Sequence, residues 1–363
     1  MDTPGVSGTL GTIILQFTRN ESATSILQDF YDLTNIDPIP EIRQFLQAMA
    51  IPPELQDTDS VDIVISTLDF KKACKKLPDK TSSSPSSCHM THYKLLAKDK
   101  GLSHILARAI TLPFQHGFSP TRCCTAIQCM LEKEPGNPFI TKLWVIQLLE
   151  ADMNFAFCLL WENHLVHHTL SHNALTPLIF GGRPGCKVHS ALLLGTVSYD
   201  YIRYTCLNAI IFNNDTKACF DRIIPYIGLM ATKCLGMPST PCMLDTIQGM
   251  NLYICAAHGV SPGFFTSTLS ALILGVLQGS GAVPCIWLSI SCILLHALST
   301  HPTGFQSICP RYSETSIYPE EAFVDDTDLW LTSTISSPSR ILISAMLKVA
   351  QFLKSLLFPV AVP

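Results

Sequence analysis

The stretch EEAFVDDTDLWL, residues 320–331, places two adjacent aspartates between two apolar runs. Asp325 and Asp326 carry like charges, so holding them side by side in a tight turn costs energy unless something offsets their repulsion. Two interpretations are open. Asp favours turn positions for local reasons, whereas a bound cation would relieve the repulsion and make the pair half of a metal site. Asp328 is expected to be an exposed residue without a role in such a site.

A second acid stands at the end of another apolar run. Residues 208–213 (NAIIFN) read as a strand that leads to Asp215, and a helix restarts shortly after it. An acid at the end of a buried strand is held by a stiff element and still reaches a cleft. Carboxylates from two such strands could hold Mg²⁺, which favours carboxylate oxygens and keeps waters that phosphate can replace. Two ions about 3.5–4 Å apart would clamp the attacking and leaving oxygens of a phosphoryl displacement.

Five motifs then follow one another in a fixed order: LEKEPGNP (131–138), FGGRPG (180–185), DTKACFDRI (215–223), GVLQGSGAVP (275–284) and AFVDD (322–326). Together they resemble the reverse transcriptases of non-LTR (LINE-like) retrotransposons. DTKACFD is similar to the first palm motif of that family, GVLQGSGAVP to its G-x-x-Q-G-x-x-x-x-P motif, and AFVDD to its aromatic-x-Asp-Asp hairpin. The resemblance extends over roughly residues 62–335.

The resemblance implies an α+β fold, a right-hand polymerase palm with a small antiparallel sheet and helices, plus fingers and with the thumb largely missing. The implied activity is RNA-directed DNA polymerase. Its partners would be an RNA template, a DNA primer and deoxynucleoside triphosphates, and its cofactors two Mg²⁺ ions, with Mn²⁺ as a substitute. The implied domains are an N-terminal helical extension (1–60), a fingers-like region with the start of the palm (61–206), the palm (207–335) and a truncated C-terminal helix (336–363).

The resemblance also assigns roles to individual residues. Asp215 and Asp325 would be catalytic metal ligands, with Asp326 a further ligand or a support for the hairpin. The nucleotide-binding residues would be Phe220, which would clash with a 2′-hydroxyl, together with Gln278, Gly279, Arg183 and Lys133.

One departure from the family pattern supports an alternative. Trp144 stands where the family usually has an arginine that braces the triphosphate, and tryptophan cannot provide a charged bidentate contact to phosphate. The alternative is therefore an inactive, drifted retroelement remnant that keeps the fold without polymerase activity.

Composition limits these interpretations further. The 363-residue chain is only 14% charged, with a formal net charge of -4, so nucleic-acid binding must rest on a local basic patch. The fifteen cysteines form no C-x-x-C framework, and the N-terminus lacks a signal-peptide pattern, so we expect an intracellular protein, cytoplasmic or nuclear, with reduced thiols. Residues 246–310 carry no charged side chain except histidine, and 282–299 approach the roughly 18 apolar residues of a membrane span. A membrane protein is thus a further alternative, although a helix buried in a large core is favoured and no membrane partner is expected.

Four local predictions complete the analysis. We expect helices over residues 41–50 and 61–77. A Ser/Pro loop should lead into one helix that runs on to residue 117. Residues 141–166 should form a strand that enters a long helix, and a Gly/Pro loop at 181–185 should open another.

Overall fold

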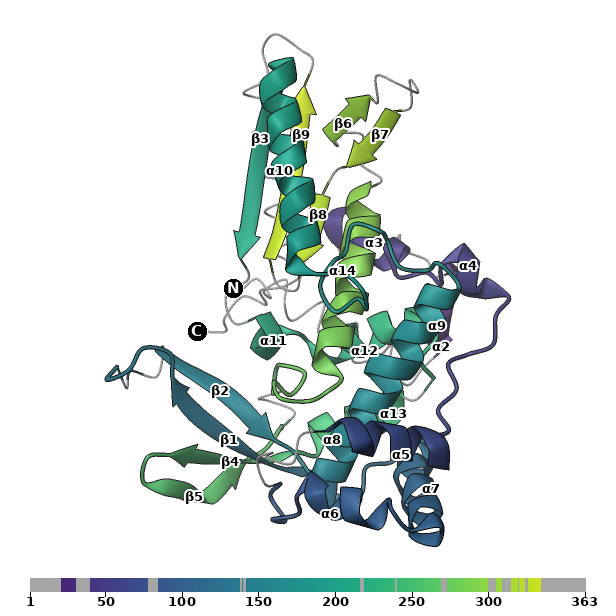
Figure 1. Ribbon diagram of the computed structural model, residues 1–363, viewed down its shortest axis with the longest axis vertical. Helices are drawn as coiled ribbons and strands as arrows, with labels where there is room; N and C mark the ends of the chain where they lie inside the picture. Colours follow the sequence, from purple (N-terminus) through teal and green to yellow (C-terminus); the bar gives the residue numbers. More distant parts are fainter. Residues whose placement is uncertain are drawn as a thin grey trace, which may run out of the picture. The chain divides into compact units, whose positions relative to one another are not determined.

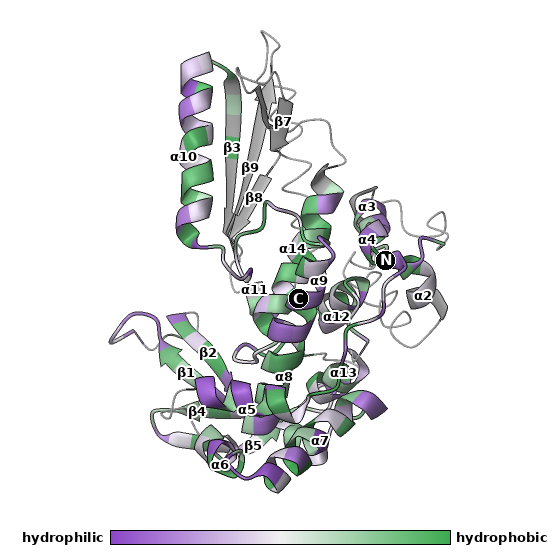
Figure 2. Cartoon of the chain, turned by 45° about the vertical axis from the view of Figure 1, so that its right-hand side comes forward, coloured by the Kyte–Doolittle hydropathy of each residue, from purple (hydrophilic) through white to green (hydrophobic). Residues whose placement is uncertain are grey.

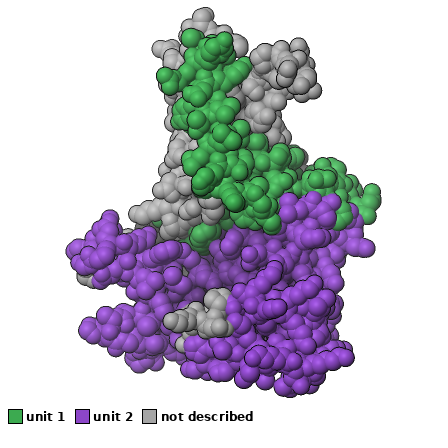
Figure 3. Space-filling model, in the orientation of Figure 1, with its two compact units in different colours: residues 1–57, 172–222, 287–363 green, residues 58–171, 223–286 purple. Residues whose placement is uncertain are grey.

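The computed structural model describes most of the chain, namely residues 21–30, 40–77, 84–137, 139, 142–215, 219–238, 240–268, 273–299, 305–308, 315–318, 320–323 and 326–333. The chain forms two compact units (Figure 3). The first unit comprises Met1–Asp57, His172–Arg222 and Trp287–Pro363, and the second comprises Thr58–Ser171 and Ile223–Ile286.

The first unit contains a three-stranded antiparallel sheet. Its order is β3 (Asn208–Asp215), β9 (Asp326–Ser333) and β8 (Glu320–Phe323). Helix α10 (Val188–Thr205) runs along these strands (Figure 1). β6 (Phe305–Ile308) and β7 (Thr315–Tyr318) form a separate antiparallel pair. The predicted strand before Asp215, an antiparallel pair of strands on either side of residues 324–325 and the helix after the Gly/Pro loop are therefore all present.

The remaining described elements of the first unit are helical. They are α2 (Glu21–Leu27), α3 (Pro40–Ala48), α4 (Pro53–Gln56), α11 (Cys219–Arg222) and most of α14 (Val283–Ser299). The predicted helix at 41–50 is confirmed as α3, which ends ahead of the two prolines at 52 and 53. Gln44 ties α3 to α14, because its side-chain amide donates a hydrogen bond of 2.8 Å to the Ala297 carbonyl.

Helices make up much of the second unit. They are α5 (Thr67–Lys76), α6 (Met90–Leu96), α7 (Lys100–His116), α8 (Ala151–Phe157), α9 (Val166–Ser171), α12 (Pro225–Cys234) and α13 (Thr240–Gln248), with a short 3₁₀ turn η2 (Thr121–Cys123) and a π-helical segment η4 (Cys158–Leu165). Aromatic rings fill the core between α7 and α8–η4. The rings of Phe114 and Trp161 each meet Phe157 edge to face, at centroid distances of 5.8 and 5.7 Å. Such contacts add to the burial energy of these large side chains.

A mixed four-stranded sheet completes the second unit. Its order is β2 (Leu143–Leu148), β1 (Thr125–Glu132), β4 (Asn251–Ala256) and β5 (Gly259–Phe265). The β1–β4 pair is parallel and the two outer pairs are antiparallel. The predicted strand followed by a long helix in 141–166 is confirmed as β2 followed by α8 and η4, whereas β1, β4 and β5 were not predicted.

The prediction of a helix over residues 61–77 is wrong for its first part, since α5 begins only at Thr67. Ser66 is the N-cap: its side chain accepts a hydrogen bond from the Asp69 amide, which satisfies a donor that the first turn leaves open. The preceding residues bond elsewhere, with the Val61 amide donating to the Gly236 carbonyl and the Ile65 amide to Thr111 Oγ1. The apolar periodicity of this segment therefore reflects burial, not helix.

The predicted continuous helix after the Ser/Pro loop is also wrong. It divides into α6 and α7, because Asp99 adopts an extended conformation and its carboxylate caps α7 by accepting from the Leu102 amide at 2.8 Å. A carboxylate at a helix N-terminus also interacts favourably with the helix dipole.

Most of the apolar stretch 282–299 forms α14, a helix of 17 residues with a strongly hydrophobic composition (Figure 2). Most of its described side chains are buried, as the core-helix interpretation expects. Among the described residues, no helix combines the length and the apolar character needed to cross a membrane. The α+β fold class is confirmed.

Candidate metal and nucleotide site

Strand pairing brings two of the predicted carboxylate positions together. β3 ends at Asp215 and β9 begins at Asp326, and these two residues are direct Cα partners in the antiparallel pair. Directly opposed Cα atoms in such pairs lie about 4.5–5.5 Å apart. Asp325, the third predicted ligand, lies outside the described residues; it belongs to the two-residue connection between Phe323 and Asp326, which are themselves partners.

The register places further acids on the same face of this sheet. Asp328 follows Asp326 by two residues, the repeat that returns to one face of a strand. It is the partner of Asn213 in β3 and of Glu321 in β8. Asp215, Asp326, Asp328 and Glu321 therefore occupy register positions on one face. Asp328 was expected to have no role in the site. Its spacing of two residues from Asp326 places it on the same face as the predicted ligands.

The opposite face of the sheet has a different composition. Half of its ten register positions are apolar, namely Ile210, Phe212, Ala322, Leu329 and Leu331, and the others are Asn208, Asn214, Thr327, Ser333 and Glu320. The face with Asp215 has four carboxylate residues at its register positions, whereas the opposite face has one, and carboxylates are the ligand type that Mg²⁺ and Mn²⁺ prefer.

Two predicted nucleotide contacts, Phe220 and Arg183, lie in the first unit and are engaged in packing. Phe220, half-buried in α11, meets Trp287 edge to face with ring centroids 6.3 Å apart. Arg183, also half-buried, donates from Nη1 to the Thr176 carbonyl at 3.2 Å. Burial raises the pKa of the nearby Cys292 thiol to about 12, while a backbone hydrogen bond from Thr176 and the Arg183 charge act in the opposite direction. Arg183 thus braces its own loop in this structure.

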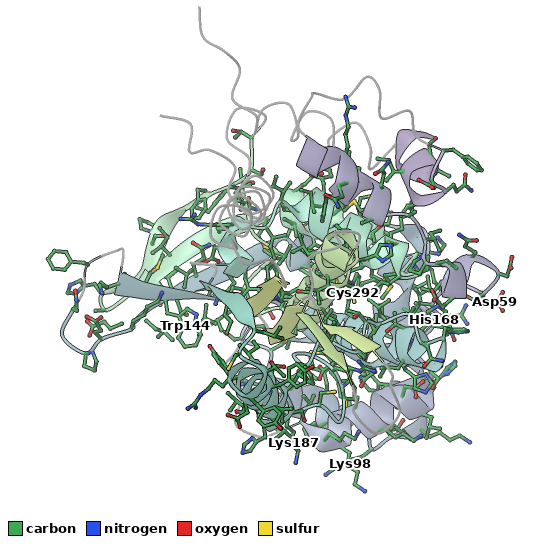
Figure 4. The ribbon with its side chains drawn as sticks, turned by 90° about the horizontal axis from the view of Figure 1, so that it is seen from above. Asp59, Lys98, Trp144, His168, Lys187 and Cys292 are labelled. Carbon is green, nitrogen blue, oxygen red and sulfur yellow. The ribbon has the colours of Figure 1, made fainter. Side chains whose placement is uncertain are left out.

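The Gln278 loop lies against β2 in the second unit. The Gln147 amide donates to the Gln278 carbonyl at 2.7 Å. In the orientation that satisfies both of its ends, the Gln278 side-chain amide donates to the Val145 carbonyl at 2.9 Å and accepts from Trp144 Nε1 at 2.7 Å. Gln278 therefore occupies the outer edge of β2, and its side chain is bonded to Trp144, a half-exposed residue of that strand (Figure 4).

The next residues of this loop require glycine. Gly279 has φ +115, a conformation that residues with a Cβ rarely adopt, and an added Cβ would collide with the Gln147 carbonyl oxygen. A Cβ on Gly281 would collide with Cys158 Sγ. Asn154 holds both glycines: its Nδ2 donates to the Gly279 carbonyl at 3.1 Å and its Oδ1 accepts from the Gly281 amide at 2.7 Å.

Gly279 therefore lies close to a neighbouring strand of the protein itself. Sequence reasoning missed Asn154, because an asparagine inside a helical pattern carries no signal of a loop more than a hundred positions away.

Lys133 begins the turn between β1 and β2 and is exposed. The same unit carries a local concentration of lysines on α5, where Lys72, Lys75 and Lys76 are exposed and Lys71 is half-buried. This α5 lysine face is the kind of local basic patch that the overall charge of the chain does not provide.

Sequence reasoning also missed a buried acidic pair after β2. Glu150 accepts from both the backbone amide and the hydroxyl of Ser86, at 2.9 and 2.8 Å. Asp152 forms a two-pronged ion pair with Arg122, one arm of which is a 3.0 Å hydrogen bond from Nη1. The carboxylates are almost fully buried, with 2% and 8% of their side chains exposed. The pair fixes the Ser/Pro loop and η2 to the end of the sheet.

A cavity of about 250 Å³ opens beside this ion pair. Its lining includes Tyr93, Arg122 and Asp152 together with apolar side chains of α7 and α8. Burial, followed by the charge of Asp152, raises the pKa of the Tyr93 phenol, so this hydroxyl stays protonated and available as a donor.

Within the described part of the chain, no cluster of three or more His, Cys, Asp or Glu side chains could hold a metal ion; Asp325 is outside that part. No model of a known protein family matches the chain, and a search of curated proteins also finds no match.

Proposed function

We propose that this chain is an RNA-directed DNA polymerase domain of a retroelement, with the β3–β9–β8 sheet of the first unit as its palm. The observation that carries the proposal is the register pairing of Asp215 with Asp326. It joins two acidic segments far apart in the sequence at one end of a rigid sheet. Cross-strand partners share a face, with Cβ atoms about 4.5–5.5 Å apart, which suits carboxylates that bind the same or neighbouring cations.

In this proposal, Asp215 and Asp325 would hold two divalent cations, and Asp326 would be a further ligand or support the hairpin. Bound Mg²⁺ ions would neutralise the charge that develops when a primer 3′-hydroxyl attacks the α-phosphate of a deoxynucleotide. β3 supplies Asp215 and β9 supplies Asp326, so sheet pairing sets the backbone separation of these two residues. Phe220 would exclude a 2′-hydroxyl by its bulk.

The second unit would supply the fingers-like contacts. The α5 lysine face and Lys133 would neutralise phosphates of the template, a sequence-independent contribution that weakens as salt increases. The Gln278–Gly279 loop, which the resemblance associates with nucleotide binding, is held in one conformation by Asn154 and β2.

A second candidate is a remnant that keeps this fold without polymerase activity. It is favoured by the bond between Trp144 and Gln278, because both polar ends of the Gln278 side chain are already used within the protein. Trp144 also offers no positive charge for a triphosphate.

Primer extension on a homopolymeric RNA template, with Mg²⁺ or Mn²⁺, tests the proposal. The chain should add deoxynucleotides, and Asp215→Asn and Asp325→Asn should each lower the rate by at least about a hundredfold, since metal stabilisation is worth several kcal/mol and each tenfold corresponds to about 1.4 kcal/mol. The matched control is Asp200→Asn, which removes an exposed carboxylate of α10 and should leave the rate unchanged. Extension by the original chain no greater than that of Asp215→Asn would rule out the active-enzyme proposal.

Trp144→Arg separates the two candidates further. If drift at this position limits the enzyme, the variant should gain activity, because arginine restores a charged bidentate contact to phosphate. A variant that folds normally and gains nothing, in a chain that is itself inactive, would favour the remnant.

A further inference from the structure

Two cysteines face each other across the parallel strands of the second unit. Cys129 in β1 is the Cα partner of Cys255 in β4. Both are half-buried and neither is in a disulfide. Neighbouring strands lie about 4.7–4.9 Å apart, and disulfides join Cα atoms separated by about 4.4–6.8 Å. The backbone spacing is therefore already suitable for a bond between the two sulfur atoms.

The two thiols also interact with each other. The pKa of Cys129 is raised first by partial burial and then by the charge of Cys255 and a side-chain hydrogen bond with it. A thiol influences its neighbour in this way only at close range. The two side chains point the same way, because register partners in adjacent strands share a face.

Cys129 and Cys255 are more exposed to solvent than another pair of neighbouring cysteines in this unit. Cys123 and Cys242 also interact, but only 2% and 0% of their surfaces are exposed. Burial raises the pKa of each of these two thiols to about 12. Reaction with an oxidant requires a thiolate and an approach path, and both are scarce at such a buried site. The face with Cys129 and Cys255 is more open, and it also carries Trp144 and Leu131, which are 50% and 46% exposed.

We propose that Cys129 and Cys255 form a reversible dithiol–disulfide site whose oxidant is a small disulfide such as oxidised glutathione. The thiolate of one cysteine attacks the small disulfide, forms a mixed disulfide and releases one small thiol. The second cysteine then attacks the protein sulfur of that mixed disulfide and displaces the second small thiol. Two electrons pass from the protein to the oxidant, and the two protons of the cysteines end on the released thiols.

The resulting bond would covalently join β1 and β4, which meet through residues 126 positions apart (255 minus 129). The same sheet carries β2 at its edge, and β2 holds the Gln278 loop. Oxidation would thus pin the parallel pair at the centre of the sheet. This site does not depend on the proposed polymerase function.

The test uses the full chain in its folded state. The protein is equilibrated with defined ratios of reduced and oxidised glutathione, quenched with an alkylating reagent, digested and examined by mass spectrometry. We expect a linked peptide that joins Cys129 to Cys255, lighter than the two separate peptides by two hydrogen atoms, and reversed by excess reduced glutathione. No Cys123–Cys242 link should form while the chain remains folded. Glutathione adducts on Cys129 and Cys255 that never resolve into the link would overturn the proposal, as would modification confined to the exposed Cys206.

A pair of variants makes the result independent of any change in folding. In Cys129→Ser, the serine keeps the size of the side chain and removes the second thiol, so Cys255 should accumulate a stable glutathione adduct. The matched control is Cys124→Ser, at a half-buried cysteine one residue before β1, which should leave the Cys129–Cys255 link at its original yield. A Cys255 that stays unmodified in Cys129→Ser, or a link lost in the control, would contradict the proposal.

Discussion

Gly279 is a position where substitution by alanine should clearly lower the free energy of unfolding. In Gly279→Ala, the new residue would have to hold φ +115, and its Cβ would collide with the Gln147 carbonyl. A residue forced into such a conformation costs about 1–3 kcal/mol. If the loop moves to relieve the collision, the hydrogen bond from the Gln147 amide to the Gln278 carbonyl is lost as well, which costs about 1 kcal/mol. We therefore expect a loss of about 2–4 kcal/mol in the free energy of unfolding of the second unit.

Two other glycines of this unit provide graded controls. Gly136 has φ +81 with nothing within 4 Å of an added Cβ, so Gly136→Ala carries the backbone cost alone, about 1–2 kcal/mol. Gly263 has neither a left-handed φ nor a close neighbour, and Gly263→Ala should change stability by less than about 1 kcal/mol.

Urea denaturation followed by circular dichroism measures these differences. The midpoint of the transition should fall by about 1 M for Gly279→Ala, since the free energy changes by about 1–3 kcal/mol per molar urea. A midpoint for Gly279→Ala equal to that of Gly263→Ala would refute the close approach to β2. Equal effects of Gly279→Ala and Gly136→Ala would show that the conformational cost acts alone.

Three further predictions concern contacts that hold the second unit together. Ser66→Ala should cost about 1 kcal/mol in the same urea assay by removing the cap of α5; an unchanged midpoint would contradict this role. Asn154→Ala should cost about 1–3 kcal/mol and speed amide exchange at Gly281, because the loop loses both side-chain bonds; unaltered exchange would contradict the clamp. Arg122→Ala should cost about 3–5 kcal/mol by leaving Glu150 and Asp152 buried without their cation, and a loss below 1 kcal/mol would show that the ion pair is not needed.

Elements of the fold could be predicted where the residues at their ends mark where the element begins or stops. Short apolar runs bounded by acids or turn residues predict three such features. They are the strand before Asp215, the strand–helix junction after β2 and the paired strands β8 and β9. The start of α5 could not be located from periodicity, because Ser66 caps the helix while the apolar pattern continues through the extended residues before it.

Contacts between segments far apart in the sequence could not be predicted. The parallel partnership of β1 and β4 joins segments more than a hundred residues apart, and neither strand shows a regular alternation of polar and apolar residues. For the same reason, the hydrogen bonds from Asn154 to the glycine loop and the bond between Trp144 and Gln278 could not be inferred from the sequence. The pairing of Asp215 with Asp326 follows from the motifs only in combination, since either acid alone suggests an ordinary strand end or turn.

We propose that the end of the β3–β9 pair is a divalent-metal site. Electron paramagnetic resonance of Mn²⁺, recorded with the protein and a deoxynucleoside triphosphate, measures this directly. We expect the chain to bind Mn²⁺ beyond what the nucleotide alone retains. Asp215→Asn and Asp326→Asn should each weaken this binding, and Asp200→Asn should leave it unchanged. Equal Mn²⁺ binding by the original chain and Asp215→Asn would contradict this proposal.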